Sequence, residues 1–284
     1  TWKQGDCVVI TDQEFPSNRV VWESLKKHGV TTRIATVTGS ESPEAAIIET
    51  LDDSTRILSV SAVQFGTGLK LDLAVLGKAC RERGILFCID AIQGIGAMDF
   101  DVQASHADFV MADAHKWMMG PEGIALFYCR KAMMEQLDLK QYGWHMLEDS
   151  TNYDSHEWEV AHSARRFECG SPNMTGVQAL HASMTLIEEV GMPLIEQLVL
   201  ENSRFMIDYF LQRADRYQLI TPEPDNRHAG IITVRPLNES TEFLFKMLAS
   251  RHVMCALRGG GIRFSPHFYT PRKRLFSALE ILDS

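Results

Sequence analysis

Residues 85–94 read ILFCIDAIQG, an apolar run that ends at a carboxylate. Five apolar residues in a row before Asp90 predict a strand that is buried on both faces, as in a parallel sheet. A helical pattern over residues 73–83 precedes this strand, with Asp72 as its N-cap and Gly84 as its stop. A helix followed by a buried strand predicts a crossover unit of a parallel sheet.

The same alternation runs through the first 130 residues. Strands are expected at 7–10, 32–35, 56–61, 85–89, 109–111 and 124–128, and helices at 18–28, 43–51 and 73–83. This order predicts a mostly parallel sheet with helices on both faces. Later helices are expected at 176–190, 194–211, 242–250 and 271–282, with strands at 231–234 and 262–265. We therefore expect an α/β fold with a large domain over residues 1–170, then a connecting helix and a smaller α+β domain over residues 171–284.

Composition excludes several classes of protein. The 284 residues are 45% hydrophobic and 23% charged, which is typical of a globular chain and not of a disordered one. No window approaches 18 consecutive apolar residues, so no transmembrane helix is expected. A net charge of −9 argues against binding to nucleic acid or to an anionic membrane. Six widely spaced cysteines without a CxxC pair predict reduced core thiols in a cytoplasmic protein.

Two polar side chains follow neighbouring strands. Asp90 ends the strand at 85–89, and Lys116 follows the strand at 109–111 after a short polar link. Parallel sheets bind ligands at the carboxyl ends of their strands, so the carboxylate and the amine are expected to face one cleft. Alone, Asp90 is also consistent with an N-cap and Lys116 with a solvated surface position. The apolar residues 117–119 argue against that second reading, because a desolvated lysine has a lowered pKa and is nucleophilic.

This pair meets the two requirements of pyridoxal 5′-phosphate (PLP) chemistry. An aspartate keeps the pyridine nitrogen protonated, so that the ring accepts electrons, and a lysine forms an imine with the cofactor. Asp90 and Lys116 therefore predict a PLP enzyme whose small-molecule substrate is an amino acid.

Several segments, in chain order, resemble the class V aminotransferase family of PLP fold type I. That family includes cysteine desulfurases and isopenicillin N epimerase-like proteins. The resemblance covers essentially the whole chain, and its motifs lie at residues 14–18, 87–94, 112–123, 167–173 and 262–270. Family members also carry an upstream segment with a phosphate-binding loop, and this chain is expected to lack it.

The resemblance implies roles for the residues around the cofactor ring. Lys116 would form the imine and then move the α-proton of the substrate. Asp90 would pair with the pyridine nitrogen, and Gln93 would hydrogen-bond the phenolic oxygen. Phe15 would stack on the ring, where desulfurases usually have a histidine. Loop packing is the alternative reading of Phe15.

Three further residues would bind the phosphate or the substrate. The resemblance places His115 near the phosphate and Ser171 at the phosphate of the neighbouring subunit, which implies a homodimer. Arg263 would bind the substrate α-carboxylate through two parallel bonds. A helix cap is the alternative for Ser171, and a sheet-edge ion pair is the alternative for Arg263.

Two departures from the family pattern affect the choice of reaction. Desulfurases carry a nucleophilic cysteine on a mobile loop before the carboxylate-binding arginine, whereas Cys255 is expected to end a strand and to belong to the core. Asp113 occupies a position that is often Ser or Thr, and an anion beside a phosphate is unfavourable unless it turns away or meets a cation.

We therefore expect a class V aminotransferase-like enzyme that acts on an α-amino acid. The alternatives are a β-lyase or desulfurase-like activity, an epimerase, and a truncated scaffold without catalysis. A nucleotide-binding reading rests on Gly94 and Gly96 alone, and Asp99 stands where a dinucleotide fingerprint has its third glycine.

Overall fold

Two β-sheets organise the chain, and the computed structural model describes all residues from 1 to 284. The first sheet has the order β2-β1-β3-β4-β5-β6, and the second has the order β7-β8-β10-β9. The strands of the first sheet are β1 (Cys7–Thr11), β2 (Thr31–Ala35), β3 (Thr55–Ser61), β4 (Leu86–Asp90), β5 (Phe109–Asp113) and β6 (Ala125–Cys129). Those of the second are β7 (Tyr217–Leu219), β8 (Ile232–Pro236), β9 (Ala256–Arg258) and β10 (Gly261–Phe264).

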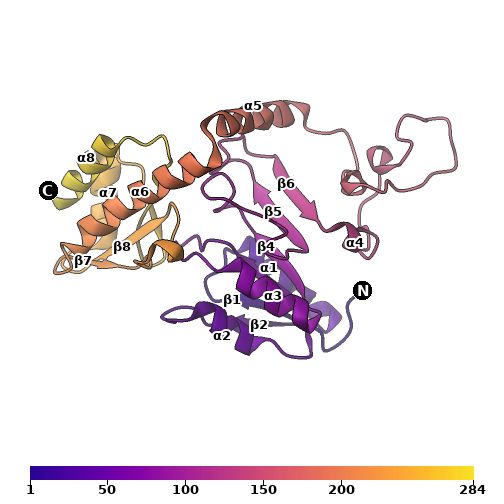
Figure 1. Cartoon of the computed structure of the whole chain (residues 1–284), viewed down its shortest axis with the longest axis horizontal. Helices are drawn as coiled ribbons and strands as arrows, with labels where there is room; N and C mark the ends of the chain where they lie inside the picture. The colour runs from indigo at the N-terminus through magenta and orange to yellow at the C-terminus, as the bar shows by residue number, and fades with distance from the viewer.

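Eight α-helices connect and cover these sheets (Figure 1). They are α1 (Ser17–Glu23), α2 (Pro43–Thr50), α3 (Leu73–Arg83), α4 (Lys131–Met134), α5 (Met174–Val190), α6 (Met192–Leu211), α7 (Thr241–Ser250) and α8 (Arg272–Asp283). No helix is both long enough and apolar enough to span a bilayer. Strands β1 to β5 pair in parallel and β6 pairs antiparallel with β5, so the expected α/β fold with a mostly parallel sheet is confirmed.

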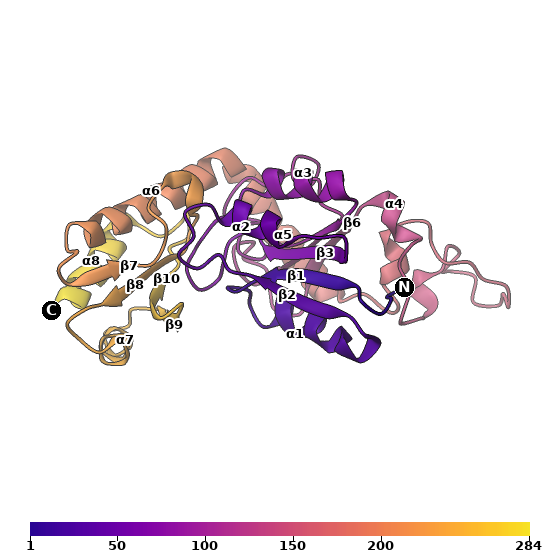
Figure 2. The same cartoon turned by 90° about the horizontal axis from the view of Figure 1, so that it is seen from below.

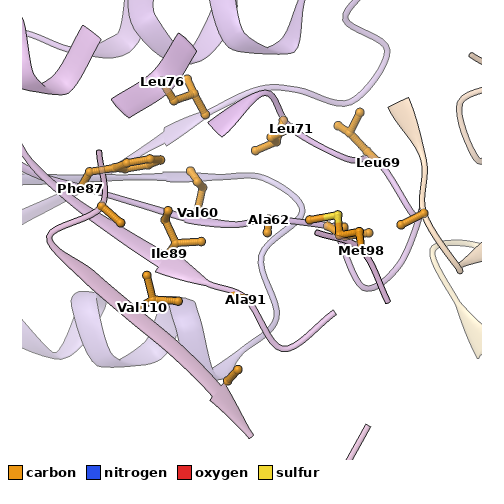
Figure 3. Packing of buried hydrophobic residues seen from close by; sticks show 14 of the residues in the cluster. Val60, Ala62, Leu69, Leu71, Leu76, Phe87, Ile89, Ala91, Met98 and Val110 are labelled. Atoms are coloured by element: carbon orange, nitrogen blue, oxygen red, sulfur yellow. The ribbon is translucent and has the colours of Figure 1, made fainter. Parts of the chain in front are cut away.

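Helices cover both faces of the first sheet, as expected. Figure 2 shows α2 and α3 on one side of β1 to β3 and α1 on the other. The first core, on the face covered by α3, contains Leu58. It also contains Val60, Phe87, Ile89 and Leu76, which are labelled in Figure 3. Intervening side chains of the same strands enter a second cluster on the opposite face. Burial on both sides explains why these strands are continuous apolar runs in the sequence.

Local signals in the sequence set the ends of α3. The Asp72 carboxylate accepts a hydrogen bond of 3.1 Å from the backbone N–H of Val75. Gly84 ends the helix with a φ of +66°, a left-handed conformation that glycine adopts without strain. Both capping residues were expected from the sequence, and both are confirmed.

Other elements differ from the expectation. The helix expected over 18–28 ends at Glu23 and continues as a 3-10 helix over Ser24–His28. Strands β7 and β9 were not expected, because three residues are too few to show an alternating pattern. Cys255 lies directly before β9, so the expectation that it ends a strand was wrong.

The helices after residue 170 join the two sheets. Helix α5 packs into the first core through Leu180 and Ile187. Helix α6 begins in that core with Ile195 and ends in the core of the second sheet with Met206 and Phe210. The division at residue 170 stays a prediction, while the packing assigns α5 to the core of the first sheet.

The segment between β3 and α3, residues 62–72, holds the second sheet against the first. The hydroxyl of Thr233 donates to the Gly66 carbonyl at 2.7 Å, and that of Thr221 donates to the Thr67 carbonyl at 2.6 Å. Gly68 has a φ of +77°, and a Cβ there would lie 2.4 Å from the Ile231 carbonyl oxygen. Only glycine therefore allows this contact between the two sheets.

An ion pair reinforces the same contact. The Arg227 guanidinium donates two bonds to the Glu44 carboxylate, at 2.6 and 2.8 Å, and the backbone N–H of Asp72 donates a third at 2.7 Å. Burial alone would raise the pKa of Glu44, but these bonds outweigh it, so the pKa lies below its ordinary value of 4.5. A bidentate pair with little solvent exposure is the kind of ion pair whose disruption is costly.

We predict that Arg227→Met lowers the free energy of unfolding by about 2 to 3 kcal/mol at pH 7, because Glu44 keeps its charge and loses its cation. Because the pKa of Glu44 is lowered in the folded state, the pair stabilises the fold fully above about pH 4.5 and loses this effect progressively as the pH falls from there through the lower pKa of the folded state. The difference between the variant and the wild type should therefore narrow in acid. Urea unfolding followed by circular dichroism at pH 7 and pH 4 measures it.

Arg204→Met is the matched control, since it breaks an exposed pair with Asp225. Exposed pairs contribute little, so this variant should unfold close to the wild type. Equal destabilisation by the two substitutions would contradict a special role for the Arg227–Glu44 pair.

Candidate active site

Polar side chains gather where the parallel strands end. Asp90 and Asp113 are the last residues of β4 and β5, and Lys116 follows β5 by three positions. Lys116 and Gln93 line a cavity of about 300 Å³ together with Arg263. The other residues that line it are Trp117, Ser265, His267, Tyr269 and Thr270. Three of the predicted site residues therefore share one cavity, with contributions from both sheets.

Lys116 and Asp90 influence each other's protonation. Burial lowers the pKa of the Lys116 amine; the negative charge of Asp90 counteracts this, and the positive charge of Arg263 adds to it. Burial also raises the pKa of Asp90. Two effects oppose this rise: the Ile92 N–H donates a 3.1 Å bond to the carboxylate, and the positive charge of Lys116 favours its ionised form. The amine is thus close to the carboxylate and easier to deprotonate than a surface lysine.

An aromatic ring lies beside the amine. The Lys116 Nζ atom is 5.8 Å from the centroid of the Phe15 ring, and 40% of the Phe15 residue is exposed. The edge of one ring meets the face of the other where Phe15 packs on Phe65, with centroids 5.1 Å apart. The structure therefore places the predicted stacking residue next to the lysine, with Phe65 supporting its orientation.

The loop that carries Phe15 is held by the buried carboxylate of Glu14, for which no separate role was predicted. One carboxylate oxygen accepts bonds from the Thr11 hydroxyl at 2.7 Å and the Gln64 amide at 3.0 Å. The other accepts bonds from the Ser61 hydroxyl at 2.6 Å and the Asn18 amide at 2.8 Å. The only signal in the sequence for a role of Glu14 is its position just after the first strand, at the same edge of the sheet as Asp90.

Arg263 on β10 lacks an anionic partner. One terminal nitrogen donates to the Phe65 carbonyl at 2.8 Å, whereas Nε is buried without any hydrogen-bond partner. Burial lowers the pKa of this guanidinium, and the positive charge of Arg258 lowers it further. The sheet-edge ion pair considered as an alternative is not formed. An unpaired guanidinium that lines a cavity is suited to bind an anion.

His115 and Ser171 lie outside this cavity lining. The His115 Nδ1 atom is 3.3 Å from the Asp113 carboxylate. Asp113, which replaces the usual Ser or Thr of the family, therefore faces a side chain that can carry a positive charge. Ser171 is exposed just before α5. Its expected contact crosses a subunit interface and stays a prediction, as does the phosphate contact of His115.

The nucleotide-binding reading of the sequence loses support. No helix follows β4 before β5 begins, whereas a dinucleotide fingerprint requires its glycines to open a helix.

Burial raises the pKa of the Cys255 thiol to about 11, so it is protonated at neutral pH. Cys255 packs against the core of the second sheet. This contact fits its expected core position and does not favour a reactive thiol.

Comparisons with known proteins identify the family of this chain. Residues 1–266 match the aminotransferase class-V family. A probable cysteine desulfurase of Pyrococcus abyssi is 28% identical over 99% of this chain and 73% of its own length. The uncharacterized aminotransferase YcbU of Bacillus subtilis is 27% identical over 96% of this chain and 70% of its own.

Solved structures show the same fold. An apo cysteine desulfurase from Thermococcus onnurineus superposes with a TM-score of 0.86 at 24% identity, and the match covers 99% of this chain and 73% of that one. The cystine C–S lyase C-DES, in complex with its reaction product cysteine persulfide, gives 0.88 at 20% identity and covers 100% and 76%. The family match extends over nearly the whole chain, and we conclude that this protein belongs to the class-V aminotransferase family.

Proposed function

We propose that this chain is a PLP-dependent enzyme that acts on an α-amino acid through Lys116. Its family uses PLP as cofactor. The observation that carries the proposal is the shared cavity, which is lined by the Lys116 amine and the unpaired Arg263 guanidinium, while the charge of the Asp90 carboxylate acts on Lys116. This arrangement offers a nucleophile, a binding group for a carboxylate and a partner for a pyridinium nitrogen.

The side chains around the cavity fit the cofactor ring. Asp90 would hold the ring nitrogen, Phe15 would lie against the ring face, and Gln93 would hydrogen-bond the phenolic oxygen. When bound, PLP supplies an electron sink that stabilises negative charge at the substrate α-carbon. His115, and Ser171 from the partner of a homodimer, would contact the phosphate.

Arg263 would orient the substrate. A carboxylate in the cavity would satisfy the buried Nε atom and offset the unfavourable burial of the guanidinium. This contact would hold the α-carbon within reach of the Lys116 amine. The lowered pKa of Lys116 favours its neutral form, which accepts the α-proton.

Within the family we propose transamination, in which the proton removed from the α-carbon is returned to the cofactor carbon. A second candidate, supported by the names of the relatives, is β-elimination of a sulfur-bearing group. In that reaction the α-proton and the β-substituent leave the substrate, and no thiol of the protein is required. A persulfide-forming desulfurase would need a thiolate, which the high pKa of Cys255 disfavours.

Borohydride reduction of the protein loaded with PLP should fix the cofactor on the peptide that contains Lys116, because the neutral amine attacks the cofactor aldehyde. Lys116→Ala should give no such adduct. Lys78→Ala, at an exposed position of α3, is the control and should be labelled like the wild type. Peptide mass spectrometry measures the label, and an adduct that persists in Lys116→Ala would refute the assignment.

Asp90→Asn should retain part of the cofactor and lose activity by about a hundredfold or more, because a neutral amide does not stabilise a protonated ring nitrogen. Steady-state rates with excess PLP measure the loss. Asp99→Asn removes a carboxylate at an exposed position and should keep the wild-type rate. A near-normal rate in Asp90→Asn would contradict the proposed role of Asp90.

The reaction branch can be assigned with a panel of amino acids, by measuring 2-oxo acid, sulfide and enantiomer separately. We expect 2-oxo acid with transfer of the amino group, and unchanged product rates in Cys255→Ala, because this thiol stays protonated. Sulfide release that disappears in Cys255→Ala would place a protein thiol in the reaction and contradict our proposal. Sulfide release that survives the substitution would favour the β-elimination candidate.

A further inference from the structure

We propose that Trp117 and His267 are positioning residues that fix the orientation of the Gln93 amide, so that its NH₂ group faces the cavity. This inference rests on the proposed function, because the acceptor for that NH₂ group would be the phenolic oxygen of PLP. It assigns a task to the residue next to Lys116 and to a histidine brought there by the second sheet.

The indole of Trp117 determines which end of the Gln93 amide is free. An indole nitrogen only donates hydrogen bonds, so the amide atom that faces it must be the oxygen. The Trp117 Nε1 atom is 3.0 Å from Gln93 Oε1, and Gln93 is 5% exposed. A flipped amide would bring two donors together and leave both unsatisfied, which is costly in a buried position. The NH₂ group therefore remains for the cavity that Gln93 lines.

His267 holds the backbone of Trp117. The backbone N–H of Phe268 donates to His267 Nδ1 at 3.0 Å, so Nδ1 carries no proton. The proton is then on Nε2, which lies 3.1 Å from the Trp117 carbonyl oxygen and donates to it. Burial lowers the pKa of His267, which favours this neutral form. The imidazole also stacks on Tyr269, with centroids 4.5 Å apart and planes 16° apart.

Two glycines make the space that Trp117 occupies. A Cβ on Gly230 would lie 2.1 Å from the Cη2 atom of the indole, and a Cβ on Gly96 would lie 2.5 Å from the Trp117 carbonyl oxygen. Gly96 also has a φ of +91°, which strains any other residue. The indole is thus packed closely against Gly230, while the backbone of Trp117 is packed closely against Gly96. A ring confined in this way can fix a neighbouring amide.

The hypothesis that Trp117 only fills space in the core predicts a different result from our proposal. If Trp117 acts only by filling space, its replacement would affect stability and would affect the cofactor in a manner independent of Gln93. If it acts through Gln93, its effect on the cofactor must vanish when Gln93 cannot donate. A double-mutant cycle separates these two cases.

The test uses the pH midpoint at which the absorbance of the bound cofactor changes. A hydrogen-bond donor to the phenolic oxygen stabilises the negative charge of that oxygen. When the donor is lost, the oxygen holds the neighbouring proton more tightly, so the midpoint moves to higher pH. We expect Trp117→Phe and Gln93→Met each to raise the midpoint by about 0.5 to 1 pH unit. His267→Phe keeps a ring and loses the donor, and should cause a smaller rise. Trp2→Phe, a partly buried indole outside the cavity, should cause none.

In the Gln93→Met background, neither Trp117→Phe nor His267→Phe should move the midpoint further. A shift in that background equal to the shift in the wild type, or no shift in Trp117→Phe alone, would overturn the inference.

A second measurement needs no cofactor. In the ¹⁵N-labelled protein without PLP, Gln93→Met should shift the indole N–H resonance of Trp117 and leave those of the other tryptophans in place. An unchanged Trp117 resonance would overturn the inference. Absence of the Lys116 adduct would refute the proposed function alone, since the indole measurement does not depend on PLP.

Discussion

The cavity exists because one short segment of the first sheet binds the second sheet through its backbone. Carbonyl groups of Phe65, Gly66 and Thr67 accept bonds from Arg263, Thr233 and Thr221, three side chains of the second half of the chain. These three carbonyl groups accept no hydrogen bond from the backbone, so the side chains of the second half of the chain satisfy them. The position of Arg263 opposite Lys116 therefore depends on the conformation of residues 62–72.

Charge is unevenly distributed around this contact. Lys116 and Arg263 line the cavity, and burial disfavours the charged form of both. The carboxylates of Asp90 and Glu14 are not part of the lining, and the charge of Glu14 helps to raise the pKa of Asp90. A cavity with cationic walls and a buried unpaired nitrogen is unfavourable for stability alone. Such local conflicts are typical of functional sites, where a bound anion relieves them.

The sequence predicts the parts of the structure that depend on neighbouring residues. Buried strands appear as apolar runs, the caps of α3 are explicit, and Asp90 and Lys116 stand at strand ends. It does not predict the Glu14 network, because its donors come from residues up to 50 positions away. The contacts of Trp117 are equally remote, since His267 lies 150 positions further along the chain. Such contacts follow from the docking of the two sheets, which no local pattern encodes.

The groups near the cavity differ in their ability to move protons. The Phe15 ring beside Lys116 carries no exchangeable proton. His267 is the remaining imidazole of the lining, yet its two nitrogens already bind the Phe268 N–H and the Trp117 carbonyl. Arginine holds its proton too tightly to exchange it. Burial lowers the pKa of the Lys116 amine, which supports our proposal that this group moves the substrate proton.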